Sequence, residues 1–166
     1  MTADTPWINV DLFAGDSSTA VGVEARCFAT TEREIISEWL AAPITGAPLR
    51  DGLRAIMEAA SETQRTNWDG NGAAPFKQRA LLNAVRLLKR LPVTMPVDDV
   101  YVDADGAVLL EWQTSTKRSF TVAVNEHGEL HFAGVFGLSR LRGRDIFVGD
   151  RVPESIRLGI RRVFDA

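Results

Sequence analysis

The chain of 166 residues has very few of the side chains on which metal sites and thiol chemistry depend. Cys27 is the only cysteine, so no internal disulfide can form, and His127 and His131 are the only histidines. A lone cysteine distant from two histidines lacks the spacing of a zinc site. The single cysteine also favours a reducing, cytoplasmic location.

Several motifs of phosphate binding and catalysis are missing as well. Gly70 and Gly72 have the spacing of the first two glycines of a dinucleotide-binding fingerprint, but Pro75 stands where the third glycine is needed. Neither a P-loop nor the serine motif G-x-S-x-G occurs. Asp69-x-Asn71 and Asp103-x-Asp105-Gly106 are only fragments of a calcium loop. We therefore predict no catalytic residues, no metal and no cofactor. An enzyme whose site carries no familiar motif stays a third alternative.

Long apolar runs are also absent, although hydrophobic residues make up 45% of the chain. No stretch approaches the roughly 20 residues of a membrane span, so we expect no membrane insertion. The net charge of −3 is unevenly spread. Residues 1–66 carry a net −5, residues 67–136 a net −1 and residues 137–166 a net +3. This balance argues against extensive coating of nucleic acid but leaves room for a local basic patch.

The segment 67–91 is the feature around which we expect the fold to form. It opens with turn-forming residues and continues in apolar residues at helical spacing, including Leu81, Val85 and Leu88. Pro75 suits the first position of a helix that we predict over 75–91. The Asp69 carboxylate is expected to fold back onto the exposed N–H groups near Phe76 and Lys77. The residues assigned to this structural motif are Trp68, Asp69, Gly70, Gly72 and Pro75, with Trp112 further along the chain.

After Pro92 the apolar period changes from helical to two. Four short segments around residues 100–102, 108–112, 120–124 and 130–132 carry large apolar residues at every second position and are separated by turns. A fifth short strand is predicted over residues 145–148. The fold class is therefore α+β, with a four- to five-stranded antiparallel meander covered on one face by helices, chiefly the helix 75–91.

No long linker or repeat divides the sequence, so we predict a single globular domain over residues 1–166. Its N-terminal part, about 30–66, is expected to be helical, with one helix beginning at Thr31 and another over 49–62, after a hairpin within 7–29. The helix-plus-meander core covers 67–135. An arginine-rich strand and helix form the part 136–166.

The pattern N-W-D-G-x-G-A-x-P at Asn67–Pro75, followed by a helix ending in Leu91-Pro92, resembles a group of small uncharacterised bacterial and phage proteins. Asp105-Gly106 and Glu111-Trp112 continue the likeness, which covers about residues 67–135. The resemblance implies an α+β core and a bacterial or phage origin. It implies no activity, although a regulatory role in a defence or mobile-element setting would suit such a group.

Arginines near the C-terminus are the most suggestive feature for function. Arginine favours bidentate contact with carboxylate or phosphate. The candidate binding residues are Arg140, Arg142, Arg144, Arg157 and Arg161. The first three alternate and would share one side of an extended segment. We expect a non-enzymatic interaction or regulatory protein that binds a protein partner. Nucleic-acid binding by residues 140–162 is the alternative, and a merely solvated charged face is the simplest reading.

Overall fold

The computed structural model describes residues 46–165, which belong to one compact unit of the chain. The helices are α2 (Ala47–Glu62), α3 (Gln78–Arg90) and α4 (Glu154–Phe164). The strands are β1 (Asp99–Val102), β2 (Val108–Ser115), β3 (Arg118–Val124), β4 (Glu129–Phe136) and β5 (Ser139–Ile146). The predicted hairpin 7–29, the helix from Thr31 and Cys27 lie outside the described residues. The single domain over 1–166 therefore stays a prediction.

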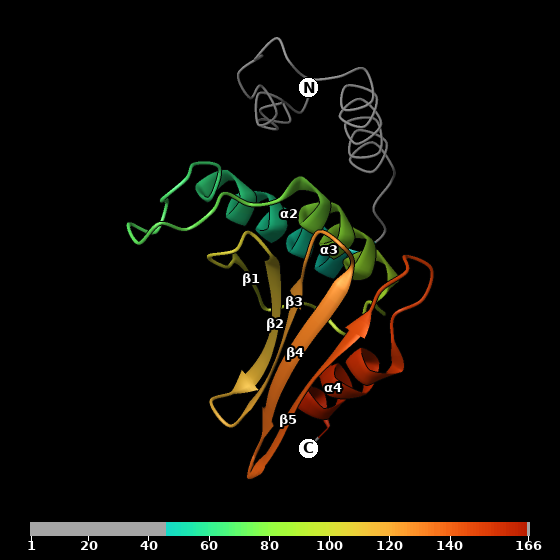
Figure 1. Cartoon of the computed structure of the whole chain (residues 1–166). Coiled ribbons are helices and arrows are strands. Elements are labelled where there is room, and N and C mark those ends of the chain that lie inside the picture. Colours follow the sequence, from blue (N-terminus) through green and yellow to red (C-terminus); the bar gives the residue numbers. More distant parts are fainter. Residues whose placement is uncertain (1–45, 166) are drawn as a thin grey trace, which may run out of the picture. The chain divides into compact units, whose positions relative to one another are not determined.

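The five strands form one antiparallel sheet in the order of the chain, as predicted for a meander (Figure 1). Asp99 pairs with Glu111, Glu111 with Thr121, Thr121 with Ala133 and Ala133 with Arg142, which gives one continuous row across the sheet. Since side chains alternate along each strand, every such row lies on a single face. The α+β class with an antiparallel sheet is confirmed.

The hydrophobic core lies between one face of the sheet and the three helices. Trp112, Phe120 and Val122 are fully buried on the strands, and Leu81 and Leu88 on α3 are nearly so. Trp112 also donates a hydrogen bond from Nε1 to the Met95 carbonyl oxygen at 3.2 Å, so its one polar atom is satisfied. The predicted packing of the helix stripe on the oily face of the meander is confirmed.

The helices divide the covered face between them (Figure 1). Helix α2 packs on β1 and α3, while α3 packs on β2 and β3. Helix α4 covers β2, β3 and β4 towards the other end, where Thr114 Oγ1 donates to the Val163 carbonyl at 3.0 Å. Gly159 lets α4 approach closely, because the ring of Phe120 occupies the space that a larger side chain would need.

Helix α3 begins later than the sequence predicted. Pro75 is not its first residue, since the helix starts at Gln78 with Lys77 in an extended conformation at the N-cap. The backbone amides just before the helix bond elsewhere: Phe76 N donates to the Thr63 carbonyl at 3.0 Å and Lys77 N to the Gly106 carbonyl at 3.0 Å. The segment 74–77 is therefore not helical, and its amides are bonded to neighbouring parts of the chain. The predicted helix end at Leu91-Pro92 is confirmed.

The fifth strand is longer and starts earlier than predicted. The sequence indicated a loop after Phe136 and a strand over 145–148, whereas β5 spans Ser139–Ile146. Gly137 and Leu138 form a two-residue turn between Phe136 and Ser139, which pair directly. Gly137 takes a φ of 66°, as hairpin turns of this length require. The arginine-rich stretch is thus a full partner of β4.

Candidate functional site

Arg140, Arg142 and Arg144 lie in a row on β5, on the face of the sheet that faces away from the helices. They pair with Val135, Ala133 and His131 of β4, whereas the residues between them pair with the buried side of β4. The spacing along the strand is roughly 7 Å from one arginine to the next. All three residues are exposed. We call this set the β5 arginine row.

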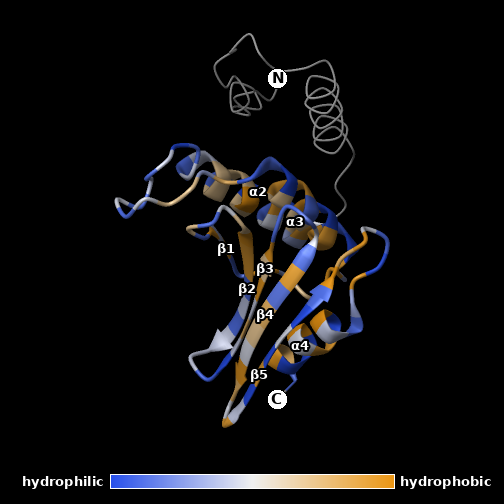
Figure 2. Ribbon diagram, viewed as in Figure 1, coloured by the Kyte–Doolittle hydropathy of each residue, from blue (hydrophilic) through white to orange (hydrophobic). Residues whose placement is uncertain are grey.

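No side chain among residues 46–165 forms an ion pair or a hydrogen bond with the β5 arginine row. Their immediate neighbours on β4 are a valine, an alanine and a histidine, so no carboxylate stands opposite them. The positive charge of the row is thus unpaired within the described part of the chain, and hydrophilic colour predominates along β5 in Figure 2.

The opposite edge of the same face is acidic. Asp99 and Glu111 stand next to each other across β1 and β2, and the Tyr101 hydroxyl lies 3.4 Å from Glu111 Oε2. Burial raises the pKa of the Tyr101 phenol, and the charge of Glu111 acts in the same direction. Small side chains such as Thr121 and Ala133 lie between the two edges. The open face therefore runs from negative at β1 to positive at β5.

The outer edge of β5 carries backbone groups that point away from the sheet. Phe147 N donates to the Gly128 carbonyl oxygen at 2.8 Å. This bond shows which residues of β5 turn their backbone groups towards β4. In an antiparallel pair, alternate residues turn their N–H and C=O groups towards the partner strand. The odd-numbered residues of β5 therefore bond to β4, and the even-numbered ones face outward. Consistently, Ile146 N is bonded not to β4 but to the Asp145 carboxylate at 2.8 Å.

The other candidate arginines, Arg157 and Arg161, are not part of this row. They lie on α4, which packs on the covered face of the sheet. Arg157 forms an ion pair with Glu154 at 3.3 Å. The adjacent Arg162 lies 4.2 Å above the ring of Phe136, which suits a cation–π contact. The five predicted binding residues thus fall into two groups on two surfaces.

The loop 67–73 has a structural explanation that differs from the predicted one. Asp69 Oδ1 accepts hydrogen bonds from Asn71 N at 2.8 Å and Ala73 N at 3.0 Å, and these bonds lower the pKa of its carboxyl. The expected bonds to the amides near Phe76 and Lys77 are absent, because those amides already have the backbone partners named above. Asp69 thus folds its own loop instead of capping α3.

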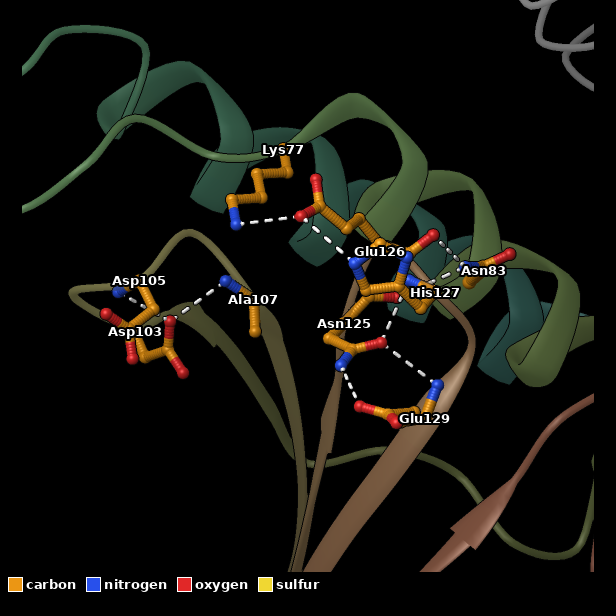
Figure 3. Close-up of polar contacts among 9 residues, drawn as sticks. All are labelled: Lys77, Asn83, Asp103, Asp105, Ala107, Asn125, Glu126, His127 and Glu129. Atoms are coloured by element: carbon orange, nitrogen blue, oxygen red, sulfur yellow. Dashed lines mark hydrogen bonds and ion pairs between the residues drawn. The ribbon is translucent and has the colours of Figure 1, made fainter.

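Two hairpin turns repeat this local design. Asp103 Oδ1 accepts the amides of Asp105 and Ala107, and Asn125 Oδ1 accepts those of His127 and Glu129 (Figure 3). In each loop a glycine with positive φ stands three residues after the accepting side chain: Gly72, Gly106 and Gly128. The sequence predicted both turns, and in each of them a side-chain oxygen accepts two backbone amides of the turn.

Trp68 and its neighbours stand on the surface beside this loop. The Trp68 indole donates from Nε1 to the Ala74 carbonyl at 2.9 Å, and its side chain is partly exposed. Gly70 and Gly72 both adopt positive φ and have open space around them. The motif is therefore a surface loop held by its own hydrogen bonds and, at Ala74, by a bond to the Ala104 carbonyl oxygen.

Polar side chains at the top of the sheet fasten the β3–β4 turn to α3 (Figure 3). Lys77 Nζ lies 3.1 Å from Glu126 Oε1, and Asn83 Nδ2 donates to the Asn125 carbonyl at 3.1 Å. His127 Nε2 lies 3.5 Å from the same Glu126 oxygen. Within residues 46–165 no three histidine, cysteine or acidic side chains gather as a metal site would require. The cluster holds the turn in place.

Sequence reasoning missed the exposed edge that β5 forms and the apolar residues at its ends. Leu138 precedes the strand, while Ile146 and Val148 follow its arginines, and all three are exposed. The alternation of arginine along residues 140–144 was a sufficient signal for an extended strand. Despite that alternation, the strand was predicted only over residues 145–148, because Gly143 and Ser139 interrupt the apolar alternation of a strand with one buried face.

Comparison of the chain with models of protein families, with curated proteins and with solved structures gave no match. The likeness to small bacterial and phage proteins therefore rests on the motif residues alone. Within residues 46–165, no helix has both the length and the apolar content needed to cross a bilayer.

Proposed function

We propose that this protein is a non-enzymatic interaction module that binds a protein partner through the open face of its sheet. The observation that carries the proposal is the β5 arginine row, whose three charged side chains have no partner within the described part of the chain. A bacterial or phage regulatory setting, in defence or in a mobile element, is the context that the motif resemblance suggests.

The chemistry of the row favours an acidic protein surface. Guanidinium groups bind carboxylates in a bidentate manner, and their charge is directed to solvent until a partner arrives. The acidic β1 edge on the same face would repel an extended polyanion that crosses the sheet, yet it can meet basic residues of a folded partner. A partner with charges of both signs therefore fits the face better than a uniformly negative one.

Nucleic acid is the second candidate, and one observation favours it. Three arginines at strand spacing present a linear set of cations, to which a phosphate backbone could bind. However, the row contains no aromatic side chain on which bases could stack, and Asp99 and Glu111 share its face. We therefore place nucleic acid second.

Capture from a lysate of the source cell with the full-length chain tests the proposal. Wild type is compared with a variant in which Arg140, Arg142 and Arg144 are all changed to glutamate. The matched control reverses three exposed arginines elsewhere, Arg50, Arg65 and Arg90. The captured protein is then purified and its affinity for all three chains is measured by calorimetry.

We expect the partner to bind wild type and the control alike and to lose most of its affinity for the β5 variant. Equal binding to all three chains would contradict the proposal. Nucleic acid would be supported instead by three results together. No protein partner is captured, wild type binds an oligonucleotide with an affinity that falls steeply with salt, and the β5 variant loses that binding.

A further inference from the structure

We infer that β5 is a docking edge on which an acidic, extended segment of the partner adds a sixth strand to the sheet. This inference rests on the proposed function and specifies the partner's chemistry. The strand has eight residues and pairs only with β4, and no described strand lies beyond it.

The backbone of β5 is prepared for this addition. The residues whose N–H and C=O groups face outward are the even-numbered ones, and these include the whole β5 arginine row. An added strand would therefore form its hydrogen bonds with the main chain of the same residues that carry the charges. Strand addition of this kind gives affinity through the backbone and specificity through alternate side chains.

The side chains of the row define the sequence that would bind. Residues directly opposite each other in a sheet point to the same face, so partner residues opposite Arg140, Arg142 and Arg144 would lie beside the guanidinium groups. A segment with aspartate or glutamate at three alternate positions satisfies all three. The intervening residues would point to the helix side, next to Leu141 and Gly143.

The ends of the strand add an apolar component. Leu138 is fully exposed at one end, and Ile146 and Val148 are largely exposed at the other. Apolar residues that flank the acidic positions of the partner could cover them. The added strand would end its backbone pairing before Ile146, because the outward amide of Ile146 is already bonded to the Asp145 carboxylate. That carboxylate is held in turn by the Ser155 hydroxyl at 2.7 Å.

Fluorescently labelled peptides of known sequence test the inference on the full-length protein. The probe is a short peptide in which three glutamates alternate with threonine and valine. The matched control peptide has the same composition with the three glutamates consecutive, so that they cannot all face the arginines. A third peptide carries N-methyl groups at its glutamates, where it would donate to β5.

Protein variants separate backbone pairing from charge. Arg142→Thr removes one guanidinium and keeps the outward amide, whereas Arg142→Pro removes both. Proline is tolerated on an edge strand where the N–H faces solvent, so no bond to β4 is lost. A two-dimensional amide spectrum of each variant confirms that it folds.

We expect the alternating peptide to bind, with Arg142→Thr roughly two- to fivefold weaker and Arg142→Pro at least about tenfold weaker than Arg142→Thr. The consecutive and N-methylated peptides should bind at least about tenfold more weakly than the alternating one.

Equal affinity for the alternating and N-methylated peptides, or for Arg142→Thr and Arg142→Pro, would overturn strand addition. The proposed function would still stand after such a result if the charge-reversed β5 variant no longer binds the partner captured from the cell. Tighter binding of a single-stranded oligonucleotide than of any peptide would also overturn the inference.

Discussion

The two edges of the sheet differ in length, charge and cover. Strand β1 has four residues, and its Val100 amide is bonded to the Asp99 carboxylate at 2.8 Å. Helix α2 packs on β1, which buries Val100 and Val102. Strand β5 has eight residues and carries three arginines, and its described outward amides are bonded only at Ile146.

The two edge strands limit pairing with other chains in different ways. Strand β1 offers little to pair with, because it has only four residues and one of its outward amides is already bonded to a carboxylate. A long edge invites pairing, and charged side chains restrict it to complementary partners. Of the two edges, β5 is the one with the length and the outward backbone groups to which another chain could add.

The largest expected losses of stability come from alanine substitution at two turn glycines, Gly106 and Gly128, whose carbonyl oxygens are bonded to other segments. A Cβ atom at Gly106 would lie 2.5 Å from the Pro75 carbonyl oxygen, and one at Gly128 would lie 2.8 Å from the Phe147 carbonyl oxygen. Both residues also have positive φ. We expect Gly106→Ala on the β1 side and Gly128→Ala on the β5 side each to cost about 2 to 3 kcal/mol of unfolding free energy.

Chemical denaturation measures both variants, and Gly137→Ala is the control. Gly137 has positive φ but open space around it, so alanine there should cost only about 1 kcal/mol. A loss at residues 106 and 128 no larger than at 137 would mean that the close backbone approach does not matter.

Alanine substitutions at the two buried helix glycines, Gly52 in α2 and Gly159 in α4, should differ in how much they lower stability. A Cβ at Gly159 of α4 would lie 2.3 Å from the tip of the Phe120 ring, whereas one at Gly52 of α2 meets the flexible ends of Leu88 and Val97. We expect Gly159→Ala to cost about 2 kcal/mol, because the buried ring cannot move away. Gly52→Ala should cost at least about 1 kcal/mol less, since side-chain tips can shift and alanine favours helix.

Thermal and urea denaturation of the two variants give the comparison. A Gly159→Ala protein as stable as wild type would show that α4 does not pack tightly on β3.

Neutralising the β5 arginine row should change association more than stability. We expect the triple change of Arg140, Arg142 and Arg144 to glutamine to alter the unfolding free energy by less than about 0.5 kcal/mol. Without its charges the long edge can pair with a second copy, so light scattering should show concentration-dependent dimers. The same change at Arg50, Arg65 and Arg90 should leave the association state as in wild type, and equal behaviour of both variants would mean that the charges do not guard the edge.

The smallest expected effect lies beside the β1–β2 turn, at Asp69. Its pKa is lowered in the folded protein, so the carboxylate contributes stability above its unfolded pKa and loses it as the pH falls. Asp69→Asn keeps the acceptor oxygen without the charge. Wild type should be slightly more stable than this variant at neutral pH, and the difference should disappear as the pH falls below about 4. A difference that is constant from neutral to acid pH would mean that the charge plays no part.

The sequence was sufficient for most of the sheet and its cover. Val108, Leu110 and Trp112 recur at every second position because their strand has one buried face, and that period of two predicts the strand directly. Leu81, Val85 and Leu88 likewise predict the buried side of α3. In both cases the local pattern and the tertiary contacts agree.

The errors occurred where a residue's partner lies far away in the chain. Pro75 fits a helix start by residue type, but the amides after it are bonded to Thr63 and Gly106, which no local rule reveals. Strand β5 shows no apolar alternation, because none of its residues is buried and Ser139 and Gly143 stand on its helix side. Gly143 leaves room there for the ring of Phe132. The division of the predicted arginine site between β5 and α4 also depends on which face α4 covers.

Hydrogen exchange of the backbone amides of β5 tests the central claim most directly. In the free full-length protein, the account predicts fast exchange at Arg140, Arg142 and Arg144 and slow exchange at Leu141 and Gly143, which bond to β4. The alternating acidic peptide should then slow the three arginine amides and leave the other two unchanged. Slow exchange of all five amides in the free protein, or no change with saturating peptide, would contradict an open docking edge.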